Sequence, residues 1–236
     1  MNDHAPRSAP VFPAAAEIER ASALCLHPPP GELAGLFGAG AHRLALRALA
    51  RPLLSGEPAV IVDGGNRFDP YEVARAERAL GGSGHVALSR LLVSRAFTCH
   101  QMEALLSRRL APALARTGAR FAVILGLPET FTDADVPFAE ACRVFRGCLA
   151  ALRRIARKGT RVVLVSSIPP VSTALPPATP GGGDRSGFLR HLARVADPCL
   201  LLRRERDEWR ATLRRGGETG AKGRSSPGAV PGKGTG

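Results

Sequence analysis

Lysine and aromatic residues are scarce in this sequence. Only three of the 33 basic residues are lysines, so arginine supplies nearly all of the positive charge. That bias is what a GC-rich genome produces, and it weakens any inference of nucleic-acid binding from the arginines alone. Aromatic residues make up 5% of the chain, which leaves few rings on which a nucleic-acid base can stack.

Paired cysteines and long apolar runs are also missing. The cysteines are odd in number and form no CxxC pair, which argues against a disulfide framework and a zinc site: Cys25, Cys99, Cys142, Cys148 and Cys199. No run approaches the roughly 18 apolar residues that a membrane span needs, and the start, MNDHAPRSAP, is polar and proline-rich. We therefore expect a cytoplasmic protein without a membrane partner.

The formal net charge is +13. So positive a surface attracts polyanions through a salt-dependent, sequence-independent term, and nucleic acid is the favoured polyanion. The alternative is a solvated basic surface that has no specific partner.

The chain divides into a lead-in, a core and a tail. With 236 residues, 44% of them hydrophobic, it is long enough for one substantial core, which we place at 31–215. Residues 1–30 form a lead-in whose first 13 residues have a disordered composition, followed by a short helix over 14–26. The tail, 216–236, mixes Gly, Ser, Pro and basic residues and is predicted to be disordered.

Short apolar runs alternate with helical spacing throughout the core. The runs are predicted to be strands buried on both faces, at 33–37, 59–63, 91–96, 121–127 and 161–166. Helices are predicted between and after them, at 43–54, 70–80, 100–114, 135–157 and 187–196. Around a turn near 206–208, Leu200 and Leu202 and then Trp209, Ala211 and Leu213 alternate with charged residues, as in an antiparallel hairpin. The expected class is α/β, a mostly parallel sheet flanked by helices with a C-terminal hairpin.

A glycine-rich turn follows the first core strand, in GLFGAGAHRLALRAL. A working phosphate loop, Gly-x-x-x-x-Gly-Lys-Ser/Thr, wraps phosphates with backbone amides and adds a lysine and a magnesium-binding hydroxyl. Gly35 and Gly40 have the right separation, but Ala41 and His42 occupy the Lys and Ser/Thr positions.

A second register of the same turn starts at Gly38. It places Arg43 and Leu44 where the last glycine and the lysine belong, so neither register supplies the lysine or the hydroxyl. Tight packing of a strand against a helix explains such glycines equally well.

Two segments carry a family resemblance: AVIVDGGNRFDPYEV and, about two dozen residues later, LLVSRAFTCHQMEALL. They resemble the core of the archaeal and eukaryotic strand-exchange recombinases of the RecA superfamily, where a strand ending in Asp-Thr-Glu-Gly precedes Phe-x-Pro-Glu. The next strand there reads Ala-Arg-Ala-Phe or Tyr, then His-Gln, and Arg95-Ala96-Phe97 with His100-Gln101 is the most specific match. The resemblance covers about 31–215 and implies a RecA-like P-loop NTPase core.

The chain departs from that family where ATP would be hydrolysed. Gly65 occupies the position of the glutamate that orients the attacking water, and Gly126 that of the aspartate that supports magnesium. We therefore expect no efficient hydrolysis and assign no catalytic residue and no metal. ATP binding without efficient hydrolysis stays an alternative. The degenerate nucleotide site would comprise Gly35, Gly38, Gly40, His42, Arg43 and Asp63.

In the family, DNA binding involves the loop after the fifth strand, here 166–188. The resemblance implies DNA contacts from this loop and the following segments, at Arg185, Arg190, Arg203, Arg204 and Arg206. A solvated arginine-rich face explains these residues about as well.

Three functions stay open from the sequence. The first is a DNA-repair or recombination accessory that binds DNA or a repair protein without hydrolysing ATP. The second is a nucleotide-dependent enzyme that uses displaced residues such as His42, Asp63 and Asp69. The third is an oligomeric assembly scaffold with no nucleic acid, for which the helix over 14–26 is a candidate contact segment.

Overall fold

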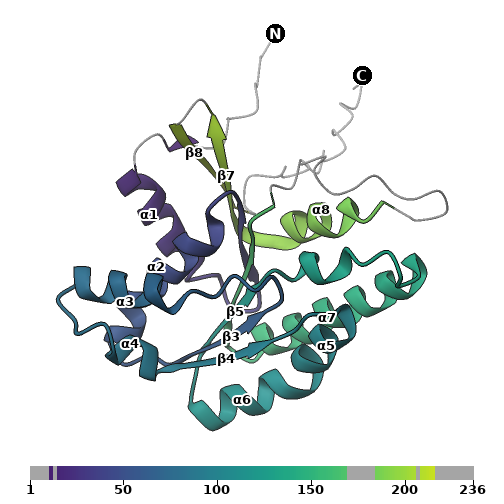
Figure 1. The fold of residues 1–236 in the computed structure, drawn as a ribbon, viewed down its shortest axis with the longest axis horizontal. Coiled ribbons are helices and arrows are strands. Elements are labelled where there is room, and N and C mark those ends of the chain that lie inside the picture. The colour runs from purple at the N-terminus through teal and green to yellow at the C-terminus, as the bar shows by residue number, and fades with distance from the viewer. Residues whose placement is uncertain (1–10, 13–14, 169–183, 206–207, 216–236) are drawn as a thin grey trace, which may run out of the picture.

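The computed structural model describes residues 11–12, 15–168, 184–205 and 208–215. Its centre is one eight-stranded sheet in the order β1-β8-β7-β2-β6-β5-β3-β4 (Figure 1). The strands are β1 Val11–Phe12, β2 Leu33–Gly38, β3 Ala59–Asp63, β4 Leu91–Arg95, β5 Phe121–Leu125, β6 Arg161–Ser166, β7 Ala196–Glu205 and β8 Glu208–Arg214.

Six neighbouring strands, from β7 to β4, run parallel, while β8 and β1 are antiparallel to their neighbours. The predicted α/β class, with a mostly parallel sheet and a C-terminal antiparallel pair, is confirmed. The sheet register places Asp63 opposite Arg95 on one side and Leu125 on the other. The carboxyl ends of β3, β4 and β5 therefore meet at one edge of the sheet, which is where open α/β sheets bind ligands.

Helices cover both faces of the sheet (Figure 1). One face carries α1 Ala15–Cys25, α2 Ala41–Leu54, α3 Pro70–Ala79 and α4 Val86–Ser89. The other face carries α5 Cys99–Ala104, a π-helical turn η1 Leu105–Arg109, α6 Leu110–Thr117, the 3-10 turn η2 Pro128–Phe131, α7 Phe138–Arg157 and α8 Ser186–Val195.

Each central strand divides its side chains between two cores. In β6, Val163 and Val165 pack on the side of α1 to α4, whereas Val162 and Leu164 pack on the side of α5 to α8. This is why the central strands read as continuous apolar runs instead of alternating ones.

Three details differ from the sequence prediction. Strand β4 lies at the sheet edge, so its side chains are half-buried or exposed and not covered on both faces as expected. The helix predicted over 100–114 is α5, η1 and α6, and it ends at Thr117 because Gly118 adopts the left-handed conformation. Residues 11–12, expected to be disordered, pair with β8.

Helix α1 forms close to its predicted position, and Cys25 and Leu26 at its end are buried against the sheet. The predicted disordered tail and the central part of the predicted DNA loop, 169–183, lie outside the described residues. Within the described ranges, no helix is long and apolar enough to cross a membrane.

Candidate functional site

The glycines of the β2–α2 turn are required by their neighbours in the sheet. A Cβ atom on Gly38, whose φ is 112°, would collide with the backbone carbonyl of Leu202 in β7. A Cβ on Gly35 would lie 2.8 Å from the Cβ of Ala196 and would also collide with the Phe37 ring. Packing against β7 therefore explains these two glycines without a bound phosphate.

Gly40 begins α2 in the left-handed conformation, with φ of 74°, and gives the helix no side-chain cap. His42 follows in the first turn and its Nδ1 lies 2.8 Å from the hydroxyl oxygen of Ser167, which follows β6. Burial, followed by the nearby Arg67 and Arg43, lowers the pKa of His42, which favours a neutral ring at pH 7. His42 is thus a poor substitute for the lysine of a phosphate loop.

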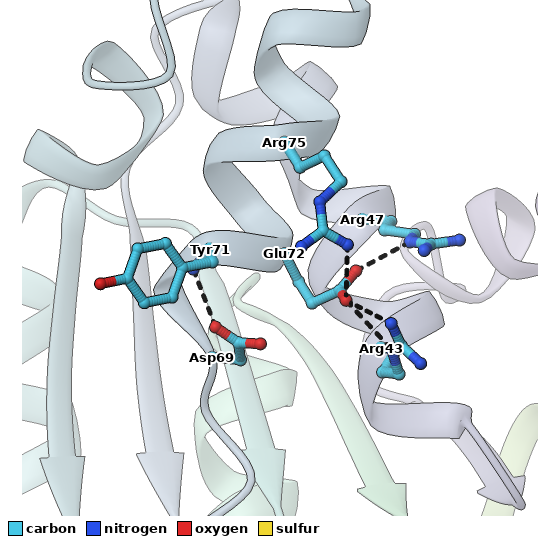
Figure 2. A network of polar contacts seen from close by, with 6 residues as sticks. All are labelled: Arg43, Arg47, Asp69, Tyr71, Glu72 and Arg75. Carbon is cyan, nitrogen blue, oxygen red and sulfur yellow. Dashed lines mark hydrogen bonds and ion pairs between the residues drawn. The ribbon is translucent and has the colours of Figure 1, made fainter.

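Arg43 is not available to replace that lysine either. It belongs to a cluster of three arginines around one carboxylate (Figure 2). The carboxylate of Glu72 in α3 accepts hydrogen bonds from Arg43 at 2.7 Å, Arg47 at 3.0 Å and Arg75 at 3.2 Å. Glu72 is 2% exposed, whereas the three arginines are about half exposed. We call these four residues the Glu72 cluster.

Burial acts to raise the pKa of Glu72, but the hydrogen bonds from Arg43 and Arg47 outweigh it, and the pKa is lowered overall. The carboxylate is therefore ionised at neutral pH. Three guanidinium groups around one carboxylate leave a local charge of about +2.

Asp63 is used to fold the loop after β3. Its side chain is buried, Oδ1 accepts from the amide of Arg67 and Oδ2 from that of Phe68, each at 3.0 Å. Arg95 approaches Oδ2 from β4 at 3.8 Å. Asp69 also has a structural role, because it caps α3 by accepting a hydrogen bond from the Tyr71 amide at 2.9 Å. Neither carboxylate is available as a displaced catalytic group in this arrangement.

Gly65 and Gly126, which the resemblance aligns with two carboxylates of the recombinases, lie in direct contact. The amide of Gly64 donates to Leu125 O at 2.7 Å, which draws the loop after β3 onto the end of β5. Gly126 has φ of 66°, and a Cβ there would collide with the Gly65 amide and lie 2.6 Å from Gly65 Cα. At Gly126, backbone thus fills the space in which a side chain would stand, whereas a Cβ on Gly65 would lie 3.4 Å from Gly126 Cα and 3.1 Å from the flexible side chain of Arg67.

A buried glutamate lies next to this contact. Glu129 Oε1 accepts from the Ser166 hydroxyl at 2.9 Å, while Oε2 is buried and receives no hydrogen bond from any residue of the described chain. Burial raises the pKa of Glu129. The structure places this side chain inward, where it contacts Ser166 at the end of β6.

We predict that Glu129→Gln changes how stability depends on pH. The folded protein binds the Glu129 proton more tightly than the unfolded chain, so the contribution of Glu129 to stability falls as pH rises from about 4.3 through the folded pKa. Glutamine keeps the acceptor for Ser166 and has no charge to bury, but its NH2 group lies where Oε2 has no partner among the described residues. Denaturant melts should therefore show the variant gaining stability relative to wild type between about pH 4 and pH 7, from an offset at about pH 4 that reflects the buried amide. Parallel pH curves for the two proteins would contradict this account.

The Arg95–Gln101 segment, the most specific part of the resemblance, makes local contacts that stabilise the turn between β4 and α5. Arg95 approaches Asp63, and the Ala96 amide donates to Asp63 O at 2.9 Å. Thr98 caps α5 through the Gln101 amide, and Gln101 Oε1 accepts from the Phe97 amide at 2.8 Å. The segment therefore closes the β4–α5 turn, while the ring of Phe97 stays exposed.

The predicted DNA-binding arginines divide between α8 and the C-terminal hairpin. Arg185 donates to the carbonyls of Phe131 at 2.9 Å and of Val136, so it fastens α8 to η2. Arg190 forms an ion pair with Asp184. Arg206 lies outside the described residues.

Arg203 and Arg204 project from β7 to opposite faces of the sheet. The alternation of buried neighbours places Arg203 on the face of α8, together with Arg210 of β8, its partner in the register. Arg214 lies on the same face and donates to the Ala193 carbonyl of α8. Arg210 and Arg214 were missed at the sequence level, although the period of two in β8 was a usable signal.

No protein-family model matches the sequence, and no curated protein matches it either. The assignment of function therefore depends on the arrangement of these residues.

Proposed function

We propose that this chain is a RecA-like core that does not hydrolyse ATP and that acts as a DNA-binding accessory protein in recombination or repair. The observation that carries the proposal is the contact between Gly65 and Gly126. By the resemblance, these are the positions of the water-orienting glutamate and the magnesium aspartate, and the register places them at adjoining strand ends, as a shared phosphate site requires.

The surroundings of this contact support the absence of turnover. Arg43, a cation near the start of α2, is bound to Glu72, and His42 has a lowered pKa. Each missing group of the cation clamp is typically worth several kcal/mol of transition-state stabilisation. Removing several at once leaves no route to hydrolysis at a useful rate.

The proposed DNA contact surface is the face of the sheet that carries α8. It joins Arg190 of α8 with Arg203 and Arg210 of the hairpin, and the register puts the last two directly opposite each other. Guanidinium groups gathered on one face suit contacts with the phosphates of a nucleic-acid backbone, which position a protein on DNA without reading its sequence.

Nucleotide binding without turnover is a second candidate, favoured by one feature. Helix α2 starts at the carboxyl edge of the sheet, and its first amides receive no acceptor from the N-cap residue, Gly40. The N-terminus of a helix favours an anion such as a phosphate. A labelled, non-hydrolysable ATP analogue tests it directly.

The proposal predicts salt-sensitive DNA binding by the full chain and no ATP turnover. Fluorescence anisotropy with labelled single- and double-stranded DNA should give a linear loss of log affinity with log salt concentration. Arg203→Glu should weaken binding and reduce the salt slope by about one or more, since it removes a phosphate contact. Arg51→Glu, on the opposite face of the sheet, should leave the slope unchanged.

Three outcomes would count against this function. ATP turnover above a heat-inactivated control, with or without single-stranded DNA, would favour the enzyme hypothesis. Failure to bind DNA or a recombinase would refute the accessory role. Oligomerisation without DNA binding would favour the assembly scaffold.

A further inference from the structure

A groove lies over α2, on the face of the sheet opposite α8. Helix α2 packs against α1 on one side and α3 on the other (Figure 1). Residues of all three helices line the groove, and the outer surface of α2 forms its floor. The groove encloses about 630 Å³. This volume is within the range of pockets that hold one small ligand or a short row of side chains.

The floor of the groove is apolar and its borders are basic. Leu44 and Ala48 of α2 lie along the floor, with Ala76 of α3 beside them. The arginines come from all three helices: Arg20, Arg47, Arg51 and Arg75. Among the described residues that line the groove, none is acidic.

The sequence of α2 explains this mixture. Leu44, Arg47, Ala48 and Arg51 follow the spacing i, i+3, i+4 and i+7, so they form a single face. The opposite face of the helix, with Leu46, Leu49 and Leu53, is buried in the core. The outward face is therefore an apolar stripe with an arginine on each turn.

Two of the border arginines are held in place. Arg47 and Arg75 each donate to the buried carboxylate of Glu72, yet their side chains remain 43% and 60% exposed. A guanidinium has five N–H donors, so a single hydrogen bond to Glu72 leaves other donors able to bind a second carboxylate. Fixed donors reduce the side-chain entropy lost on binding.

We propose that this groove binds a protein segment that carries acidic and apolar side chains together, as an acidic amphipathic helix does. Carboxylates of the segment pair with the border arginines, and its apolar side chains cover Leu44 and Ala48. A nucleic acid fits less well, because a duplex is too wide to enter the groove and its described lining has no Phe, Tyr or Trp ring for base stacking. The imidazole of His27 lines the groove, but its Nδ1 lies 3.1 Å from Nη1 of Arg161. The inference does not depend on DNA binding, since the proposed DNA surface lies on the other face of the sheet.

The test is binding of a labelled synthetic peptide of about 16 residues to the full chain, at about 0.15 M salt. The peptide places leucines on one helical face and glutamates beside them. A peptide of the same composition, scrambled so that the leucines share no face, should bind about tenfold more weakly. Equal binding of the two would overturn the proposal, as would absence of binding by the amphipathic peptide.

A pair of charge reversals locates the site. Arg51→Glu should weaken the amphipathic peptide about tenfold, whereas Arg116→Glu should change its affinity less than about twofold. The two arginines are matched, because each is exposed in the last turn of its helix and each reversal alters the net charge equally. Equal effects of the two reversals on peptide affinity would refute the groove as the peptide site. A loss of single-stranded DNA binding in Arg51→Glu, parallel to its loss of peptide binding, would also refute the proposal, because the groove would then be a nucleic-acid surface.

Discussion

Replacing Gly126 with alanine should lower the midpoint of thermal unfolding by roughly 10 °C. The position has φ of 66°, a conformation that costs an L-residue about 1 kcal/mol or more. The added Cβ would also meet the backbone of Gly65, at its amide and, 2.6 Å away, at its Cα. Backbone cannot rotate aside as a side chain can, so we expect the free energy of unfolding to fall by about 3–5 kcal/mol. For a domain of this size, each kcal/mol lowers the unfolding midpoint by roughly 2–4 °C.

Gly118→Ala is the matched control. Gly118 has φ of 67°, nearly the same conformation, but a Cβ there has no atom within 4 Å. It should lose only the conformational part, about 1 kcal/mol. The difference between the two variants, measured by calorimetry or denaturant melts, isolates the steric part. Equal losses would show that the loop after β3 can move away from β5.

The same contact bears on the proposed absence of hydrolysis. In the recombinases that the sequence resembles, both positions carry carboxylates beside the phosphate and the attacking water. In this chain the loop after β3 is hydrogen-bonded onto β5 through the Gly64 amide, and Gly126 permits that approach. A carboxylate introduced at Gly126 would disrupt this packing, so we do not expect a single substitution there to produce hydrolysis.

The strand pattern of the core was predictable because apolar runs of five or six residues are long enough to be buried on both faces. The C-terminal hairpin was predictable from the alternation of Trp209, Ala211 and Leu213 with polar residues in its second strand. The exposure of β4 was not, since LLVSR resembles the central strands in composition, and only its pairing on one side makes it an edge. Position in a sheet is a tertiary property.

In the candidate site, too, some features were visible in the sequence and others depend on tertiary contacts. The glycine spacing of the β2–α2 turn is visible in the sequence, but the reason for Gly38 is the carbonyl of Leu202, more than 160 residues away along the chain. The Glu72 cluster was missed for a related reason. The pairs Arg43/Arg47 and Glu72/Arg75 each have helical spacing, yet nothing in that spacing shows that α2 and α3 lie side by side.

Glu72→Gln should destabilise the protein by about 2 kcal/mol. The substitution leaves Arg43, Arg47 and Arg75 close together without a counter-charge and replaces one carboxylate oxygen by an amide that cannot accept their hydrogen bonds. The cost stays below that of a fully buried pair because the arginines are about half exposed and water screens their repulsion. Urea melts at pH 7 provide the measurement.

Glu140→Gln is the control for this change. Glu140 also forms an ion pair with an arginine three residues along its helix, Arg143 at 3.8 Å, and lies 3.5 Å from Nε2 of His100, but its side chain is 40% exposed. An exposed pair of this kind is worth at most about 1 kcal/mol. Similar losses in the two variants would mean that Glu72 acts as an ordinary surface carboxylate.

The pH dependence separates the charge of Glu72 from its shape. Since its pKa is lowered in the folded state, its contribution is complete above the unfolded value of about 4.3 and is lost as pH falls through the folded pKa. The stability difference between wild type and Glu72→Gln should therefore shrink below about pH 4 and vanish once the carboxyl is protonated in both states. High salt at pH 7 should reduce the difference only in part, because screening acts on the exposed guanidinium groups more than on the buried carboxylate they surround. A difference that stays constant across pH would mean that packing of the amide, and not the ionised carboxylate, accounts for the loss.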